Sequence, residues 1–236
     1  MTAQDWIARA RAQQRTALDE QAGKSLLAEY GVAVPRSLSV KNAGEVDAVF
    51  AKLKPPVVVK IMSPDILHKS DAGCVKVGLK SAAEVKDAIN VMSASPKIQG
   101  ARIDGYLIEE MAPAGQEIVI GGLRDPDFGP LVMVGLGGIF VEVLADVSFR
   151  ICPITRLDAQ EMIAELKGAA ILNGVRGMKP VSKDAIIDVL LKVGGENGLL
   201  MRHADDITEA DINPLIVSEC NAVAVDARFI LRHQYE

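Results

Sequence analysis

The sequence predicts an α+β fold that is divided into two lobes. Up to Gly100, helical patterns alternate with short strands, whereas the chain after Gly100 is dominated by strands joined by short Gly, Pro and Asp turns. Hydrophobic residues make up 49% of the 236-residue chain, which is enough for a substantial core. We therefore expect an N-terminal helix over residues 1–20, a first lobe over residues 21–100 and a second lobe over residues 101–236.

The helices are predicted from amphipathic spacing and from their end signals. Ser81 and Glu84 have the spacing of a capping box at a helix start, and Gly31 followed by Pro35 is typical of a helix end. Helices are expected over residues 2–17, 19–30, 43–53, 82–92, 159–166 and 183–193.

The strands are predicted from runs of β-branched and other apolar residues bounded by turn residues. The run over residues 57–61 is apolar except for Lys60, so this strand is expected to be largely buried. Strands are expected over residues 37–40, 57–61, 75–79, 106–111, 117–123, 131–135 and 148–151, and a hairpin over residues 211–226 closes the fold.

Composition and charge exclude several classes of protein. The net charge is −5 and the sequence has no Lys/Arg run, which argues against a nucleic-acid partner. Cys74, Cys152 and Cys220 form no CxxC pair, so we expect no disulfide framework and no zinc site. Residues 1–15 contain no apolar core of a signal peptide, and no run reaches the length of a membrane span. We expect a soluble, cytoplasmic protein without a membrane partner.

Three oxygen-bearing side chains near the C-terminus are expected to share one face of the hairpin. Asp211 and Asn213 alternate along a strand, so both side chains leave the same face. If a two-residue loop is centred on Glu219–Cys220 or on Cys220–Asn221, Asp226 faces the same side as Asn213, whereas a three-residue loop breaks this relation. A site with few oxygen ligands suits Mg²⁺, which takes further ligands from water and phosphates. Taken alone, these residues support an exposed, solvated hairpin as well as they support a magnesium site.

Charged residues farther upstream predict contacts to a nucleotide. Lys60 lies in a buried strand and needs an anion, which a nucleotide phosphate can supply; a lysine that reaches water at the strand end is the alternative. Glu109, Glu110 and Met111 end one predicted strand and Glu117 begins the next. Such a link can bind adenine through backbone groups and ribose through a carboxylate. By themselves these residues favour the alternative, an ordinary hairpin with solvated acids.

A polar loop and a turn supply further candidate residues. His68, Lys69 and Ser70 lie between two predicted strands, where Lys69 and Ser70 can hold a phosphate beside the imidazole; a surface histidine is the alternative. Arg124 begins an Arg-Asp-Pro turn and offers a planar guanidinium to a γ-phosphate, and a solvated turn arginine is the alternative.

Together, these segments resemble a known family. The charged residues described above occur in the order used by ATP-grasp enzymes, which clamp ATP between two α+β lobes. More closely, four segments resemble the β subunit of ADP-forming acyl-CoA synthetases: HKSDAG at 68–73, GLRDPDFGPLV at 122–132, GLGGIFVEV at 135–143 and DINPL at 211–215. The resemblance extends over residues 18–231, with one departure: Cys74 stands where the family usually has a second Gly.

The resemblance implies an ATP-grasp fold and an acid–CoA ligase (ADP-forming) that works as a heteromer. In this family ATP phosphorylates a histidine, the phosphoryl group passes to a small carboxylic acid, and the acyl phosphate yields acyl-CoA. This chain is then expected to bind Mg²⁺ and ATP/ADP and to act with a CoA-binding α subunit that carries the main phosphohistidine. His68 matches a second phosphoryl carrier, Asp211 matches the acid that steadies phosphohistidine, and Asn213 and Asp226 match the magnesium ligands.

Two alternative functions fit these residues less well. An ATP-grasp ligase that couples its phosphorylated carboxylate to an amine is disfavoured by the intact His68 loop. A nucleotide-sensing module without turnover is disfavoured because all five of these residues are present: Lys60, Arg124, Asp211, Asn213 and Asp226.

Overall fold

The computed structural model describes residues 2–66, 73–138, 144–175 and 179–232. It divides the chain into two compact units: unit 1 contains Met1–Val34 and Pro113–Glu236, and unit 2 contains Pro35–Ala112. Each unit has one antiparallel sheet and its own buried apolar core. Each set of functional residues is therefore positioned by the core of its own unit.

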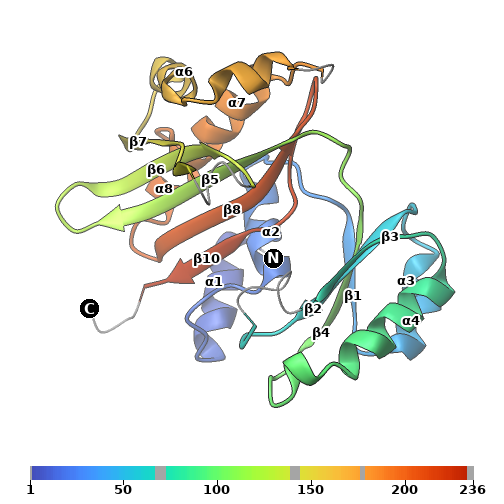
Figure 1. Ribbon diagram of the computed structural model, residues 1–236. Coiled ribbons are helices and arrows are strands. Elements are labelled where there is room, and N and C mark those ends of the chain that lie inside the picture. The colour runs from blue at the N-terminus through green and yellow to red at the C-terminus, as the bar shows by residue number, and fades with distance from the viewer. Residues whose placement is uncertain (1, 67–72, 139–143, 176–178, 233–236) are drawn as a thin grey trace. The chain divides into compact units, whose positions relative to one another are not determined.

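Unit 2 is a four-stranded sheet with helices α3 and α4 packed against it (Figure 1). The strands in spatial order are β1 (Ser37–Val40), β4 (Gly105–Glu110), β2 (Val57–Met62) and β3 (Val75–Leu79). The helical segments are η1 (Ala43–Glu45), α3 (Val46–Phe50), α4 (Ala82–Ser93) and η2 (Pro96–Ile98). The Ser81 hydroxyl accepts a hydrogen bond from the Glu84 N–H at the start of α4, as the capping signal predicts. The central strands β2 and β4 are buried along most of their length.

Unit 1 is built on a six-stranded sheet with the order β10-β8-β5-β6-β7, and β9 pairs with β8. The strands are β5 (Gln116–Asp125), β6 (Gly129–Leu136), β7 (Val147–Ile151), β8 (Ile207–Val217), β9 (Ala222–Ala224) and β10 (Arg228–Leu231). The helical segments are α1 (Ala3–Ala12), α2 (Glu20–Glu29), α6 (Arg156–Glu165), η3 (Ala169–Asn173), α7 (Lys183–Gly194) and α8 (Leu199–Arg202).

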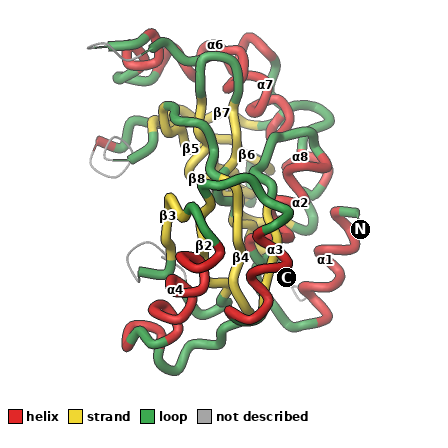
Figure 2. Tube along the Cα trace, turned by 90° about the vertical axis from the view of Figure 1, so that its right-hand side faces the viewer, coloured by secondary structure: helices red, strands yellow, loops and turns green. Residues whose placement is uncertain are grey.

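The two faces of the unit 1 sheet differ in burial. Helices α2, α7 and α8 lie on one side of the strands (Figure 2) and pack against β5, β6 and β10. Ile120 and Val132 point to this helix-covered face and are 0% exposed. Leu123 and Phe149 point to the opposite face and are 47% and 53% exposed. We call this second face the open face of unit 1.

Units 1 and 2 do not have the boundaries that were expected for the two lobes from the sequence. Strand β4 pairs with β1 and β2, so unit 2 continues to Ala112 instead of ending at residue 100. The N-terminal segment belongs to unit 1, because the Leu18 N–H donates to the Phe229 carbonyl and Ala33 bridges to Val223. Both differences arise from pairing between distant segments, which a local pattern does not report.

Most of the predicted helices and strands are confirmed, with small shifts at their ends. The first helix ends at Ala12 instead of residue 17, because Gln13 caps it and Gln14 has a φ of 54°. The helix expected over residues 43–53 is divided into η1 and α3. Helix α8 and strand β10, each of 4 residues, were not predicted.

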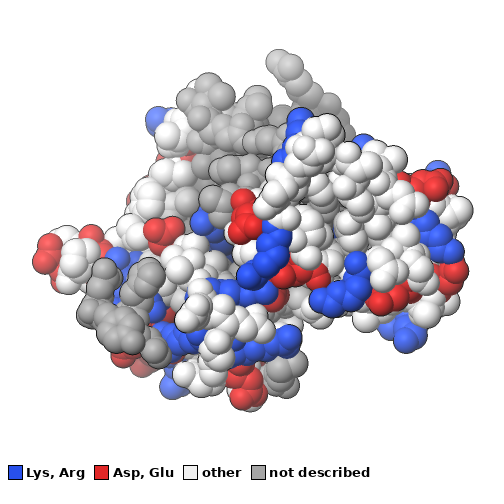
Figure 3. Space-filling view, turned by 90° about the horizontal axis from the view of Figure 1, so that it is seen from below, with Lys and Arg blue, Asp and Glu red and all other residues white. Residues whose placement is uncertain are grey.

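The surface carries charges of both signs. Acidic and basic side chains lie next to one another over the face shown in Figure 3. The cysteines are free thiols, of which Cys74 and Cys152 are buried and Cys220 is exposed. Within the described ranges, no helix is long and apolar enough to cross a membrane.

Candidate functional site

The open face of unit 1 carries a row of residues that cross-strand pairing brings together. Asp211 of β8 lies opposite Gly121 of β5 on one side and opposite Arg228 of β10 on the other. Met133 of β6 lies opposite Gly121, and Phe149 of β7 lies opposite Met133. Directly opposed residues share one face of a sheet, so these positions form a continuous row across the open face.

The hairpin geometry places Asn213 opposite Asp226. The Ser218 N–H donates to the Asn221 carbonyl at 2.8 Å, which leaves Glu219–Cys220 as a two-residue loop. The Asn213 N–H donates to the Asp226 carbonyl at 3.3 Å. The geometry expected for a loop centred on Glu219–Cys220 is therefore confirmed, and Asn213 and Asp226 lie on the open face.

The carboxylates on this face influence each other. Desolvation by the surrounding protein raises the pKa of Asp211, and the negative charge of Asp226 raises it further, whereas Arg228 acts in the opposite direction. Asp211 nevertheless keeps contact with solvent. Because a like charge disfavours ionisation, a cation bound here stabilises both carboxylates in their charged form.

The donor set on this face fits a magnesium ion. The Asn213 amide and the Asp226 carboxylate supply hard oxygen donors, which Mg²⁺ prefers. Among the residues that the structure describes, no group of three or more His, Cys, Asp and Glu side chains is placed to hold a metal ion. A cation at the hairpin therefore takes few protein ligands and completes its shell with water or phosphate oxygens, as Mg²⁺ commonly does.

A groove of about 340 Å³ lies over the row on the open face. Met133 and Phe149 line its apolar side, and Asp211 and Arg228 line its polar side. Gly121 lies between them, where an added Cβ would come within 2.9 Å of the Met133 Cε. The volume and the mixture of apolar walls with a few polar groups are typical of a small-molecule or peptide-segment site.

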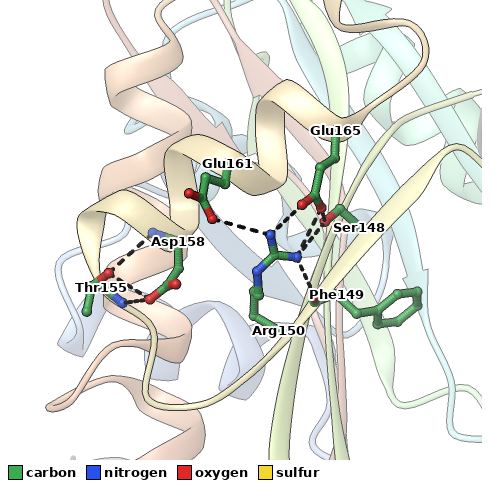
Figure 4. Close-up of polar contacts among 7 residues, drawn as sticks. All are labelled: Ser148, Phe149, Arg150, Thr155, Asp158, Glu161 and Glu165. Carbon is green, nitrogen blue, oxygen red and sulfur yellow. Dashed lines mark hydrogen bonds and ion pairs between the residues drawn. The ribbon is translucent and has the colours of Figure 1, made fainter.

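An ion-pair network holds the strand that carries Phe149 (Figure 4). Arg150 donates to the Glu165 carboxylate at 3.0 Å and lies 3.7 Å from Glu161, while the Ser148 hydroxyl also donates to Glu165. Hydrogen bonds from Arg150 and Ser148 lower the pKa of Glu165 to about 2. Figure 4 shows Arg150 and Ser148 directed at helix α6, whereas Phe149 points away from it. The network anchors β7 to α6 and so fixes the side of the sheet on which Phe149 lies.

In unit 2, Lys60 forms a buried ion pair with Glu109. The Lys60 Nζ lies 3.1 Å from the Glu109 Oε1, and the two residues are 5% and 0% exposed. Val58 is opposite Glu109 and Lys60 is opposite Leu107, so both charged side chains leave the same face of the sheet. The burial predicted for Lys60 is confirmed, and Glu109 supplies an anion beside it.

The other residues expected to contact the nucleotide lie at strand ends. The Glu110 Oε1 accepts a hydrogen bond from the Lys54 N–H at 2.9 Å. The Met111 N–H donates to the Pro56 carbonyl at 3.2 Å, and Met111 is 43% exposed. In unit 1, Glu117 lies near the start of β5 and is exposed. The Glu110 carboxylate and the Met111 N–H thus already have protein partners.

The structure does not bring Arg124 together with Asp211. Asp211 is opposite Gly121, and Arg124 lies three residues farther along the same strand, so its side chain leaves the opposite face. The Arg124 guanidinium donates to the Ala204 carbonyl and lies 3.7 Å from the Asp205 carboxylate. These contacts tie Arg124 to the turn between α8 and β8.

His68 and Ser70 lie outside the described residues, and their predicted roles stay predictions. Cys74 is described: it is 1% exposed, and its carbonyl accepts a hydrogen bond from the Ile61 N–H at 2.9 Å. The left-handed backbone position in this segment belongs to Gly73, with a φ of 70°. Cys74 in place of a second glycine therefore introduces no left-handed strain.

Sequence reasoning missed two residues of the open face. Gly121 leaves space beside Asp211, and Arg228 adds a positive charge on the other side. Strand alternation contained a usable signal for Arg228, because it lies two residues after Asp226 and so on the same face. No comparable local signal marks Gly121, whose position depends on the pairing of β5 with β8.

Comparison with known proteins identifies the family. The family model of the ATP-grasp domain matches residues 9–231. The chain is 44% identical over 231 residues to the β subunit of acetate–CoA ligase (ADP-forming) I from Pyrococcus furiosus, and the match covers 97% of each chain. It is also 41% identical over 210 residues to acetate–CoA ligase (ADP-forming) I from Archaeoglobus fulgidus, of whose length it spans only 30%.

Solved structures agree with this assignment. Dinucleotide-forming acetyl-coenzyme A synthetase 1 from Ca. Korarchaeum cryptofilum, in complex with coenzyme A, Ca-AMPCP and HgCl+, matches with a TM-score of 0.91 and 41% identity, over 98% of this chain and 100% of that chain. The complex of the same protein with coenzyme A and Mg-AMPPCP matches with a TM-score of 0.84 and 39% identity, over 98% and 100% of the two chains. The α+β ATP-grasp fold predicted from the sequence is confirmed. The chain belongs to the ATP-grasp family and, within it, to the β subunits of ADP-forming acetate–CoA ligases.

Proposed function

We propose that this chain is the ATP-binding subunit of an ADP-forming acid–CoA ligase. The observation that carries the proposal is the 44% identity, over 97% of both chains, to a β subunit of acetate–CoA ligase (ADP-forming). In this role the chain binds Mg²⁺ and ATP and exchanges a phosphoryl group with a histidine. The phosphoryl group then passes to a small carboxylic acid, and the acyl phosphate reacts with CoA.

In unit 1, we assign the metal to Asn213 and Asp226 of the hairpin and the positioning of the histidine to Asp211. Asn213 and Asp226 hold Mg²⁺, which neutralises phosphate charge when it is bound. Asp211 accepts a hydrogen bond from one ring nitrogen of the histidine, so that the lone pair of the other nitrogen is directed at phosphorus. A nitrogen–phosphorus bond forms as the bond from the γ-phosphorus to the bridging oxygen breaks, and ADP leaves with that electron pair. The position of Asp211 on the open face, opposite Gly121 and Arg228, supports this arrangement.

In unit 2, the proposal assigns phosphate binding to Lys60, with Glu109 holding its ammonium group in place. The 3.1 Å ion pair and the burial of both residues support a fixed position for this charge. Glu110, Met111 and Ser70 remain proposed nucleotide contacts of this unit, as does Glu117 in unit 1. His68 remains the proposed second phosphoryl carrier.

The proposal also requires a CoA-binding partner that carries the main phosphohistidine. A relative from Archaeoglobus fulgidus supports this, because the present chain spans only 30% of its length and the remaining part provides room for such domains. The Ca. Korarchaeum cryptofilum synthetase was solved with coenzyme A and with its phosphohistidine segment pointing towards the nucleotide-binding site. We place the assembly in the cytoplasm, where the three thiols of this chain stay reduced. Cell fractionation tests this location.

The experiment is phosphorylation by γ-labelled ATP with Mg²⁺, with and without a CoA-binding α subunit from a related ligase. We expect acid-labile, base-stable label on histidine and, with CoA and acetate present, formation of acetyl-CoA. Asp226→Asn is expected to weaken the Mg²⁺ dependence, and His68→Ala tests whether this chain itself carries label. ATP binding without label on either chain would contradict the ligase proposal and favour a nucleotide-sensing module.

A further inference from the structure

Arg228 differs from most of the described arginines of unit 1 in the contacts it makes; within the described ranges Arg9 also has no hydrogen bond or ion pair, but it lies over the Trp6 ring. It lies on the open face directly opposite Asp211 and lines the groove. Arg11, Arg150 and Arg156 all hold carboxylates at 3.2 Å or less. The Arg228 guanidinium, in contrast, forms no hydrogen bond or ion pair with the part of the chain that the structure describes, and the residue is exposed.

The charges around Arg228 are acidic and lie on the same face. Asp211 is its direct cross-strand neighbour, and Asp226 precedes it by two residues, so both carboxylates leave the face from which Arg228 projects. Glu209 lines the same groove. A phosphoryl group that enters this groove meets several negative charges and requires a cation beside it.

A guanidinium suits this task better than an ammonium group. Its planar array of N–H groups binds two phosphate oxygens at once, and it keeps its charge at all physiological pH values. Phosphoryl transfer depends mainly on positioning and charge neutralisation of such oxygens. The sequence assigned this task to Arg124, but Arg124 leaves the other face of the sheet and is held by Ala204 and Asp205.

We infer that Arg228 binds the γ-phosphate of ATP and stays bound to the phosphoryl group while it is transferred to the histidine that Asp211 positions. The inference rests on the proposed function, in which ATP is the phosphoryl donor. Arg228 contributes N–H donors only: the phosphorus–oxygen bond to ADP breaks, the nitrogen–phosphorus bond forms, and the guanidinium neither gains nor loses a proton. Asp211 holds the histidine, and Arg228, next to it on the polar side of the groove, holds the phosphoryl oxygens.

The test compares the affinities of Mg·ADP and Mg·AMPPCP for the full chain by calorimetry. The ratio of the two affinities isolates the contribution of the γ-phosphate, and it does not depend on turnover. We expect Arg228→Gln to lower the affinity for Mg·AMPPCP by about 10- to 100-fold, the worth of charge-assisted hydrogen bonds, with little change for Mg·ADP. Arg228→Lys keeps the charge but loses the planar fork, so we expect an intermediate loss.

Two variants serve as controls. Arg156→Gln removes the same charge from an exposed site on α6 and is expected to leave both affinities unchanged. Arg124→Gln removes the arginine of the helix-covered face and is expected to lower the melting temperature without a selective loss for Mg·AMPPCP. Melting curves for every variant separate misfolding from a lost contact, and Arg228→Lys keeps the test valid if Arg228→Gln does not fold.

The possible outcomes are distinct. A wild-type ratio in both Arg228 variants overturns the inference, and so does a selective loss of Mg·AMPPCP affinity in Arg124→Gln. If the wild-type chain binds neither nucleotide, the proposed function fails and the inference fails with it. Nucleotide binding by the wild type with an unchanged ratio in Arg228→Gln leaves the proposed function standing and removes only the inference.

Discussion

The buried Lys60–Glu109 pair gives a quantitative test of how unit 2 is held together. Lys60→Met removes the charge while keeping a long, flexible side chain. Two unit charges at the observed 3.1 Å attract each other by about 5 kcal/mol at an effective dielectric constant of about 20. Removing one member of a buried pair typically costs about 3–5 kcal/mol, because the other charge stays buried. We expect Lys60→Met to lower the free energy of opening of unit 2 by this amount.

Amide hydrogen exchange measured by mass spectrometry on peptides of β2 and β4 is the appropriate assay, since it reports on unit 2 separately from unit 1. The double variant Lys60→Met with Glu109→Leu removes both charges, so it is expected to lose less stability than Lys60→Met alone. Lys86→Met is the matched control in the same unit: its ion pair with Asp47 is 2.7 Å long, but the side chains are 35% and 68% exposed. We expect that control to cost no more than about 1 kcal/mol. If Lys60→Met loses no more stability than Lys86→Met, the reasoning is refuted.

Three further predictions concern unit 1. The folded-state pKa of Glu165 is lowered to about 2 from an ordinary value of 4.5 by neighbouring donors, so its contribution to stability is present above about pH 4.5 and is lost as the pH falls towards 2. Melting curves of Glu165→Gln should therefore depend less on pH in this window than those of the wild type. Burial raises the pKa of Cys152 to about 12, so iodoacetamide at about pH 8 should label the exposed Cys220 and leave Cys152 unmodified in the native protein, as read by mass spectrometry. Gly122→Ala would place a Cβ 2.6 Å from a methyl group of Leu200, and denaturant unfolding should show a loss of about 1–3 kcal/mol; an unchanged midpoint would show that α8 yields without cost.

The local parts of the candidate site were predictable because strand geometry has a strict period of two. The Glu219–Cys220 loop fixes the register of the hairpin, and alternation then puts Asn213 and Asp226 on one face. For Lys60, the continuous apolar run around it predicted burial, as observed. In these cases the information needed lies within a few residues of the chain.

Other parts of the site were not predictable in this way. Alternation tells which residues of one strand share a face, but it does not tell which face of the sheet is covered by helices. Arg124 was therefore assigned to a phosphate, although the structure ties it to Ala204 on the helix-covered side. Arg228 was overlooked because its importance depends on lying opposite Asp211.

By itself, the sequence determined the type of most helices and strands and the family, because these follow from short-range periodicity and from motifs in order along the chain, whereas the hairpin register among the loops considered was settled by the structure. Only the tertiary structure decided that β4 completes the sheet of unit 2, that the N-terminal segment belongs to unit 1, and that Glu109 is the partner of Lys60. It also decided which arginine faces Asp211. The physical reason is that pairing between distant strands and the packing of helices on one face depend on contacts across the whole unit, which no local window of residues contains.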